Sequence, residues 1–199
     1  MRNAIAFDYP TSRTPEMIAG SELVLRKASM PDIRPLLELI NGYAAKGIML
    51  PRTEFEMSEN IRDFTLAFSG DKLVGCGALH FYSPTSGEVR SLAVDPTIKN
   101  RGIGRAIVEA LELEANEYQL HSIFAFTYAP GFFERVGFHE VERGALPLKA
   151  WKDCLRCPKF QQCDEIAVIK YLVPEELRHD PVVESVTTLD FIQLPVLRS

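Results

Sequence analysis

The chain is poor in cysteine and has no long apolar run. Four cysteines in 199 residues are too few for a disulfide-stapled scaffold of this length. No stretch approaches the roughly 20 apolar residues of a membrane helix. Residues 1–17 lack the continuous apolar core of a signal peptide. We therefore expect a cytoplasmic protein without a membrane partner.

Basic charge is also scarce. The chain has 22 Lys and Arg residues against 27 Asp and Glu residues, a formal net charge of -5. Nucleic-acid-binding domains normally carry a basic excess on one face, so we expect no nucleic-acid partner. With 46% hydrophobic and 25% charged residues, the composition is that of an ordinary globular domain with a sizeable core.

Hydrophobic periodicity predicts a mixture of strands and helices. Strands are expected where apolar residues alternate or run continuously, and helices where they recur every three or four positions. The predicted strands are 22–27, 63–69, 72–82, 88–94, 123–128, 138–143 and 165–172, and the predicted helices run from Ser29 to near Gly47 and over 54–62, 102–118 and 130–137. This order predicts an α+β fold with helices packed on one mixed sheet.

The ends of the chain differ from its middle. Residues 1–20 show no strand or helix period and are interpreted as an N-terminal arm, residues 21–173 as the folded domain, and residues 174–199 as a C-terminal extension. The apolar segment 187–197 offers a surface for a homodimer. Inside the domain, Gly75 and Gly77 interrupt a predicted strand, which suggests a bulge or the close approach of another backbone.

A glycine loop follows the predicted strand 88–94. Gly102 and Gly104 stand where the loop enters a helix, and Arg101 and Arg105 flank them. Without side chains there, backbone N–H groups can approach a phosphate, and the helix dipole adds positive potential. A simple left-handed turn would explain the same glycines. The loop is neither a Rossmann fingerprint, because no third glycine follows, nor a Walker A loop, because Lys-Ser/Thr is missing.

The loop resembles the acetyl-CoA motif of the GNAT acetyltransferases, Gln/Arg-x-x-Gly-x-Gly/Ala. Here the motif reads Lys99-Asn100-Arg101-Gly102-Ile103-Gly104, with Lys99 in place of Arg or Gln. The later Phe132-Phe133-x3-Gly137-Phe138 is similar to the family's F-Y-x-x-x-G-F. The resemblance spans roughly residues 22–172 and implies the GNAT fold, a mixed central sheet with helices on both faces.

The same resemblance implies that acetyl-CoA is the co-substrate. Its pyrophosphate would lie on the loop amides, and its pantetheine arm would pair with strand 88–94 in a wedge between the fourth and fifth predicted strands. The cofactor-binding residues that it implies are Leu92, Ala93, Val94, Lys99, Asn100, Arg101, Gly102, Ile103, Gly104, Arg105 and Phe133.

Acetyl transfer to an amine needs a base, because an α-amine is mostly protonated at neutral pH. Glu88 stands where the histone-acetyltransferase branch of the family carries its glutamate base, and we predict that it is catalytic. Period two places Glu88 and Arg90 on one face of the strand, so an ion pair on that face is the alternative. The proton donor stays open, because Phe133 stands where many relatives have tyrosine, which leaves Tyr128 or water.

Four segments also resemble the acetyltransferase domain of the N-acetylglutamate synthases. They are 47–52, 87–94, 132–138 and 146–149. This resemblance implies that the acceptor is the α-amine of L-glutamate, as in arginine biosynthesis, and that the chain is similar to the short stand-alone synthases. Two carboxylates need at least two cations or equivalent donors, and the implied substrate-binding residues are Arg52, Arg90, Ser91 and Lys149. The alternatives are another small amine, a protein amine, or a non-catalytic acyl-CoA-binding module.

Cys154, Cys157 and Cys163 form the one cluster of thiols. Three thiols fit part of a zinc site, yet a tetrahedral site needs a fourth ligand and no histidine lies in the segment. Buried free thiols or a redox-labile disulfide are the alternatives. We therefore assign no metal to the site residues.

Overall fold

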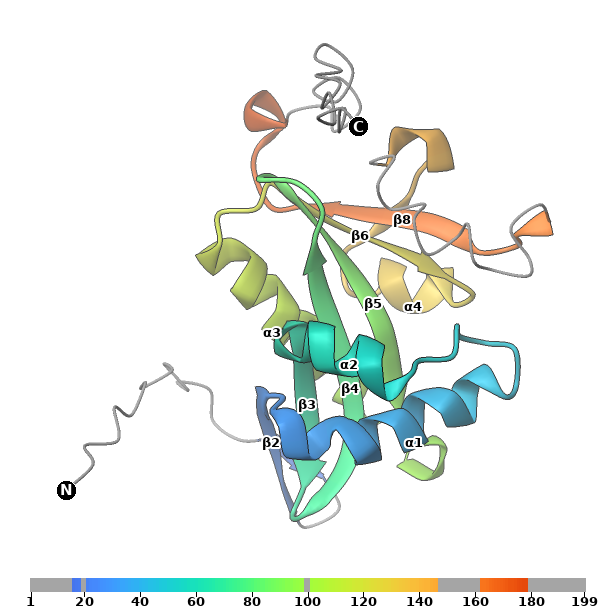
Figure 1. The fold of residues 1–199 in the computed structure, drawn as a ribbon. Helices are drawn as coiled ribbons and strands as arrows, with labels where there is room; N and C mark the ends of the chain where they lie inside the picture. The colour runs from blue at the N-terminus through green and yellow to red at the C-terminus, as the bar shows by residue number, and fades with distance from the viewer. Residues whose placement is uncertain (1–15, 19–20, 99–100, 147–161, 179–199) are drawn as a thin grey trace, which may run out of the picture.

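The computed structural model describes residues 16–18, 21–98, 101–146 and 162–178. Within these residues the strands form one eight-stranded sheet in the order β1-β2-β3-β4-β5-β6-β8-β7 (Figure 1). The neighbours are antiparallel except β5 and β6, so the sheet is mixed, as predicted. The strands are β1 (Glu16–Ile18), β2 (Ser21–Lys27), β3 (Phe64–Ser69), β4 (Lys72–Phe81), β5 (Ser86–Val94), β6 (Ser122–Thr127), β7 (His139–Glu140) and β8 (Ile166–Tyr171).

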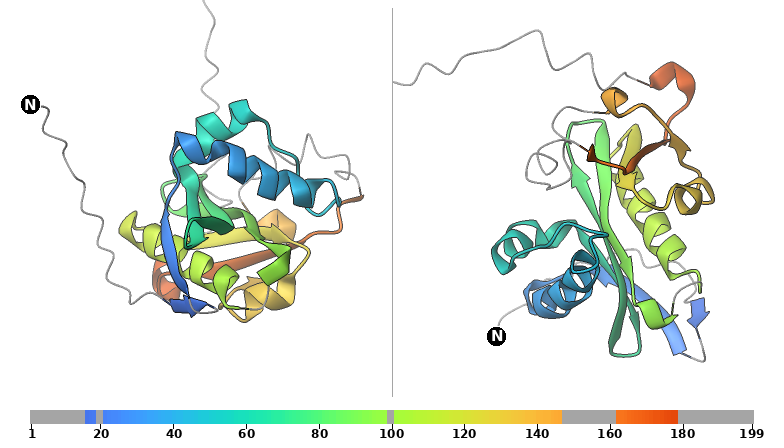
Figure 2. Two further views of the ribbon diagram at one scale, coloured as in Figure 1. Left: turned by 90° about the horizontal axis from the view of Figure 1, so that it is seen from below. Right: turned by 90° about the vertical axis from the view of Figure 1, so that its right-hand side faces the viewer.

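Helices cover both faces of the sheet, which confirms the predicted architecture (Figure 2). On one face lie α1 (Ile33–Ala44) and α2 (Glu54–Asn60), and on the other lie α3 (Ile103–Glu117) and α4 (Pro130–Glu134). Short 3-10 helices connect the elements: η1 (Met30–Asp32), η2 (Ile61–Asp63), η3 (Pro96–Ile98), η4 (Arg143–Ala145) and η7 (Glu175–Leu177). Among the described residues, no helix has the length and apolar character needed to cross a membrane.

An apolar core on each face holds the helices to the sheet. Leu36 and Ile40 of α1 pack with α2 and with the inner residues of β3 and β4. Ile107 and Leu111 of α3 pack on the opposite face against β4, β5 and β6. Both helices bury the stripe that their three-and-four residue spacing predicts. The sheet between them is therefore held from both sides.

The structure corrects the predicted boundaries in three places. Within the arm predicted at 1–20, Glu16–Ile18 form β1 and pair with β2, a strand too short to show a period in the sequence. Asp63, predicted to begin a strand, belongs to η2 instead. The strand predicted at 138–143 is shortened to His139–Glu140, followed by one further hydrogen bond from the Val141 N–H to the Ala167 carbonyl of β8, because the chain then turns into η4.

The β4 strand packs so closely on α3 that Gly77 has no room for a side chain. A Cβ there would lie 2.8 Å from Cγ2 of Ile107 and 3.2 Å from Cδ1 of Leu92. The register between β4 and β5 shifts at the same point, so Ser91 and Leu92 together face Gly77. This is a β-bulge, and the predicted bulge or close approach at this glycine is confirmed.

We predict that Gly77→Ala lowers the free energy of unfolding by about 1–3 kcal/mol, because the added methyl overpacks the interface with α3. Denaturant unfolding measures the change. Gly42→Ala is the matched control: Gly42 lies within α1 with nothing within 4 Å of its added Cβ, so the substitution should stabilise the protein by about 0.5–1 kcal/mol. Equal effects at both glycines would contradict the close packing.

Candidate active site

The β5 and β6 strands pair only where they begin. Residues 86–88 of β5 pair in parallel with residues 122–124 of β6. Beyond Glu88 the two strands separate (Figure 1), and β6 continues to pair with β8 as far as Thr127. The separation lies between the fourth and fifth strands counted from β2, which is where the resemblance to the GNAT family implies a wedge.

Glu88 lies at the point of separation. It is the register partner of His80 in β4 and of Phe124 in β6, and it is only 9% exposed. Three residues later, Ser91 has a φ of +53°, a left-handed conformation that costs a non-glycine residue on the order of 1–3 kcal/mol. The bulge at Ser91 redirects the second half of β5, so Glu88 and Arg90 precede the bend and the predicted cofactor contacts follow it.

After the bulge, the backbone of β5 faces β4 and the open side alternately. The Asp95 N–H donates a 2.9 Å hydrogen bond to β4, so by alternation Ala93 also faces β4, while Leu92 and Val94 face away. The Val94 carbonyl accepts a 2.6 Å hydrogen bond from the Tyr43 hydroxyl of α1. Of the three residues whose backbone is predicted to contact the cofactor, Ala93 thus faces β4, whereas Leu92 and Val94 have backbone groups on the open side.

Asp95 fixes the end of β5 where the glycine loop begins. Lys72 Nζ lies 2.6 Å from its carboxylate, and Thr97 donates to the same side chain through its N–H at 2.9 Å and its hydroxyl at 2.6 Å. The hydrogen bond from Lys72, followed by those from Thr97, lowers the pKa of Asp95 to about 2. A permanently charged Asp95 thus ties the loop to the β3–β4 hairpin.

The glycine loop opens α3 in the way that an anion site needs. Gly102 is the residue before the helix and has a φ of +79°, which glycine adopts without steric cost. The first N–H groups of a helix have no partner within it and lie at its positive end. Arg101 and Arg105 are exposed beside them, although Arg105 also pairs with Glu109 at 3.3 Å. These residues fit a phosphate group.

Phe132 lies over the first turn of α3. A Cβ on Gly104 would lie 3.3 Å from Cε2 of this ring. Phe133, which the resemblance assigns to the cofactor, is instead 5% exposed, and its ring packs edge-on against Phe132 and Phe138. The Ile103 side chain is likewise buried in the core. Phe133 and Ile103 therefore act mainly as packing residues, and Ile103 can offer a ligand only its backbone.

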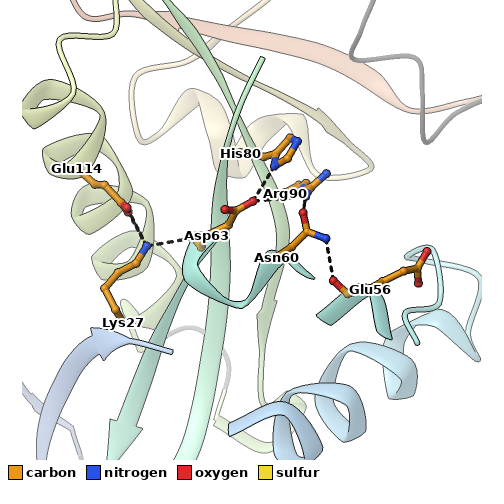
Figure 3. A network of polar contacts seen from close by, with 7 residues as sticks. All are labelled: Lys27, Glu56, Asn60, Asp63, His80, Arg90 and Glu114. Atoms are coloured by element: carbon orange, nitrogen blue, oxygen red, sulfur yellow. Dashed lines mark hydrogen bonds and ion pairs between the residues drawn. The ribbon is translucent and has the colours of Figure 1, made fainter. Parts of the chain in front are cut away.

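Arg90 belongs to a network on the face that carries α2 (Figure 3). Its Nη2 lies 3.2 Å from Asn60 Oδ1 and 3.5 Å from Asp63 Oδ2, and its side chain is 12% exposed. His80 Nδ1 lies 2.6 Å from the same Asp63 oxygen. Arg90 thus pairs with Asp63 of η2, an ion pair that the sequence did not predict.

Lys27 connects this network to α3. Its ammonium donates to the Asp63 carbonyl at 3.2 Å and to both Glu114 oxygens at 2.8 and 2.9 Å. Burial raises the pKa of the Glu114 carboxyl, and the hydrogen bond from Lys27 opposes this rise. Residues from β2, η2 and α3 thus fix the backbone that presents the Asp63 carboxylate.

Arg52 lies in the loop before α2, and α1 holds that loop in place. Asn41 Nδ2 donates to the Arg52 carbonyl at 3.0 Å, and Asn41 Oδ1 accepts from the Arg52 N–H at 2.9 Å. The half-exposed side chain of Arg52 therefore extends from a fixed backbone. Lys149, Lys99 and Asn100, which the resemblance also assigns to the site, lie outside the described residues.

Cys76 and Cys163 are free thiols in the described part of the chain. Cys76 is fully buried, and burial raises the pKa of its thiol to about 12. Cys163 accepts a hydrogen bond from Arg143 at 3.2 Å, while Cys154 and Cys157 lie outside the described residues. In the part of the chain that the structure describes, no cluster of His, Cys, Asp and Glu could hold a metal ion.

His80 and Asp63 are the residues that the sequence did not reveal. The sequence does contain a hint of His80, because it is a polar residue near the apolar end of a predicted strand. It lies opposite Glu88 once the turn at 83–85 pairs the two strands. Asp63 carried no such signal, because its role depends on η2 replacing the start of the predicted strand.

The family can now be identified. The model of the acetyltransferase (GNAT) family matches residues 33–138, more than half of the chain. The chain belongs to the GNAT acetyltransferase family. An uncharacterized N-acetyltransferase from Chlorobaculum tepidum is 40% identical over 153 residues, which are 77% of this chain and 99% of the relative. An amino-acid acetyltransferase from Mycobacterium tuberculosis is 39% identical over 122 residues, 60% of this chain and 70% of the relative.

Solved structures agree with this assignment. A Mycobacterium tuberculosis protein in complex with CoA and a second ligand has a TM-score of 0.64 at 31% identity, over 75% of this chain and 99% of its own. N-acetylglutamate synthase from Neisseria gonorrhoeae, complexed with coenzyme A and N-acetyl-glutamate, has a TM-score of 0.70 at 23% identity, a likeness of fold. The match covers 76% of this chain and 35% of the synthase. This protein is a GNAT-type acetyltransferase, and acetyl-CoA is its co-substrate.

We predict that Gly104→Val raises the KM for acetyl-CoA by at least about tenfold, equivalent to about 1.4 kcal/mol, because the side chain displaces Phe132 and crowds the first turn of α3. Steady-state kinetics with each substrate varied in turn measures the effect. Gly42→Val, in open space on α1, is the control. A normal KM for acetyl-CoA in Gly104→Val would show that the glycine loop does not bind acetyl-CoA.

Proposed function

We propose that this acetyltransferase moves the acetyl group of acetyl-CoA to the α-amine of L-glutamate, as an N-acetylglutamate synthase serving arginine biosynthesis. The observation that carries the proposal is that Glu88 and Arg90 lie on one face of β5, just where β5 leaves β6. A carboxylate beside a guanidinium suits an acceptor with an ammonium group and carboxylates. The amino-acid acetyltransferase relative supports the same substrate class.

The donor and acceptor sides meet on β5. We assign the Leu92 backbone, the Val94 N–H and the α3 terminus at Gly102 to acetyl-CoA. Arg90 and the fixed loop at Arg52 serve the acceptor. A guanidinium has five N–H donors and can serve several acceptors at once, so the contact of Arg90 with Asp63 is compatible with a role for Arg90 in holding a substrate carboxylate.

The reaction follows from this arrangement. Glu88 accepts a proton from the ammonium, directly or through water, and the neutral amine attacks the thioester carbonyl carbon. The Leu92 N–H on the open side of β5 is placed to stabilise the oxyanion. When the C–S bond breaks, the second proton of the nitrogen passes to the CoA thiolate. Tyr128, exposed directly after β6, or water carries this proton.

A thiol-release screen against the amino acids and simple amines tests the acceptor. We expect L-glutamate to give the highest kcat/KM, with L-glutamine lower because it lacks one carboxylate and leaves a cation without its partner. L-glutamine or a non-amino-acid amine ranking first would overturn the glutamate assignment while leaving the acetyltransferase activity intact. Peptide amines belong in the same screen, since turnover of a peptide alone would indicate a protein acceptor.

Two substitutions test the roles on β5. Glu88→Gln should lower kcat by a factor of about 10²–10⁴, the usual contribution of a general base, with little change in either KM.

Arg90→Ala should raise the KM for glutamate by about 10- to 100-fold, the loss of a charge-assisted hydrogen bond, and leave the KM for acetyl-CoA nearly unchanged. Arg34→Ala, at an exposed residue of α1, is the control. Equal rises in both KM values would mean that Arg90 only supports the fold.

A further inference from the structure

We propose that His80, oriented by Asp63, is the final protein acceptor of the proton that the substrate ammonium loses, and that Glu88 passes the proton to it. The proposal rests on the proposed function only in requiring an amine acceptor beside Glu88. It adds two residues to the reaction that neither the sequence motifs nor the family resemblance assigns.

The first observation is the geometry of the Asp63–His80 pair. The Nδ1 atom of His80 lies 2.6 Å from Asp63 Oδ2. An ionised carboxylate only accepts hydrogen bonds, so Nδ1 carries the hydrogen and the other ring nitrogen, Nε2, is the proton-accepting atom. Figure 3 shows this second nitrogen directed away from Asp63. Asp63 thus fixes both the tautomer and the direction of the ring.

The second observation is the position of the ring next to Glu88. His80 and Glu88 are direct register partners on β4 and β5, and directly opposed residues of an antiparallel pair have Cβ atoms about 4.5–5.5 Å apart on the same face of the sheet. A proton can pass between side chains at that separation directly or through one water. No other histidine of the described residues lies on these two strands.

The chemistry explains why a second acceptor is useful. Carboxyl groups ordinarily titrate near pH 4.3, imidazoles near 6.5 and α-amines near 8. A carboxylate alone therefore holds a proton taken from an ammonium only briefly at neutral pH. An imidazole holds it better by about two pH units on this ordinary scale. Transfer to His80 makes the deprotonation of the amine less unfavourable.

Both acidic and basic side chains surround His80. Asp63 of η2 and Glu88 of β5 are acidic, Arg90 of β5 is basic, and Tyr82 of its own strand meets the ring edge-on at 5.0 Å. Lys27 and Glu114 lie beyond the Asp63 backbone and pair with each other. A proton that passes from Glu88 to His80 therefore stays within this one group of charged side chains.

The difference in exposure between Glu88 and His80 indicates the direction of proton transfer. Glu88 is 9% exposed, whereas the His80 side chain is 30% exposed. The buried carboxylate faces the acceptor amine, and the half-exposed imidazole reaches water. The balance is complete: the ammonium gives one proton to His80 through Glu88, the amine forms the C–N bond as the C–S bond breaks, and the second nitrogen proton goes to the CoA thiolate. His80 then releases its proton to solvent.

The first test uses the wild-type protein. Ring nitrogen NMR spectra should show His80 at neutral pH with a protonated Nδ1 and an unprotonated Nε2, assigned by the signal lost in His80→Asn. This measurement needs no acceptor, so it stands even if glutamate proves to be the wrong substrate. The opposite tautomer, with the proton on Nε2, would overturn the proposal.

The second test compares pH profiles of kcat/KM with the best acceptor of the thiol-release screen. In His80→Asn we expect the rate at neutral pH to fall by about 10- to 100-fold and the acid limb of the profile to change its midpoint, as removal of a proton acceptor requires. Asp63→Asn should move the same limb with a smaller loss. His139→Asn, at an exposed histidine of β7, is the control and should leave the profile unchanged.

A merely structural role for the pair gives a different result. His80→Asn would then lose activity in equal proportion at every pH, or keep the wild-type profile, and either outcome overturns the proposal. If His80→Asn does not fold, His80→Gln and Asp63→Asn provide the same comparison. If the wild type is active on glutamate and the acid limb of the His80→Asn profile does not move, the proton relay is refuted and the proposed acceptor stands. If the wild type is inactive on glutamate, only the proposed acceptor is refuted.

Discussion

The separation of β5 from β6 after Glu88 is the constraint on which the rest of the site depends. Parallel strands normally continue to pair, because each unpaired N–H and C=O group must otherwise find another partner. Here β6 keeps its other edge paired with β8, and the bulge at Ser91 bends β5 away. The β5 strand thereby exposes backbone on one side, with Glu88 and Arg90 before the bend and Leu92 and Val94 after it.

The bend in turn depends on glycine. Gly77 faces the two bulged residues and allows α3 to approach until its side chains touch the β4 backbone. The same helix begins at Gly102, so the packing that bends β5 also positions the helix terminus that we assign to the phosphate groups. Strand geometry and anion site are two results of one close contact between α3 and the sheet.

Much of this could be predicted from the sequence. The helices α1 and α3 follow from their apolar spacing, and the order of elements and the glycine loop point to the GNAT family. The side-chain network could not be predicted, because it depends on registers and on one short 3-10 turn. Asp63 reaches His80 and Arg90 only because the chain forms η2 before β3. Phe133 shows a different limit: the motif position predicted to bind the cofactor packs into the core, and its neighbour Phe132 covers the helix terminus.

Two side chains of helix α1 make three hydrogen bonds whose joint effect is easily overlooked. Asn41 holds the Arg52 backbone, and Tyr43, two residues later, binds the carbonyl at the end of β5. These bonds hold α1 to the loop that carries Arg52 and to the end of β5. A tilt of α1 would therefore move the Arg52 loop and the end of β5 together, so the distance between these two segments depends on a single turn of helix.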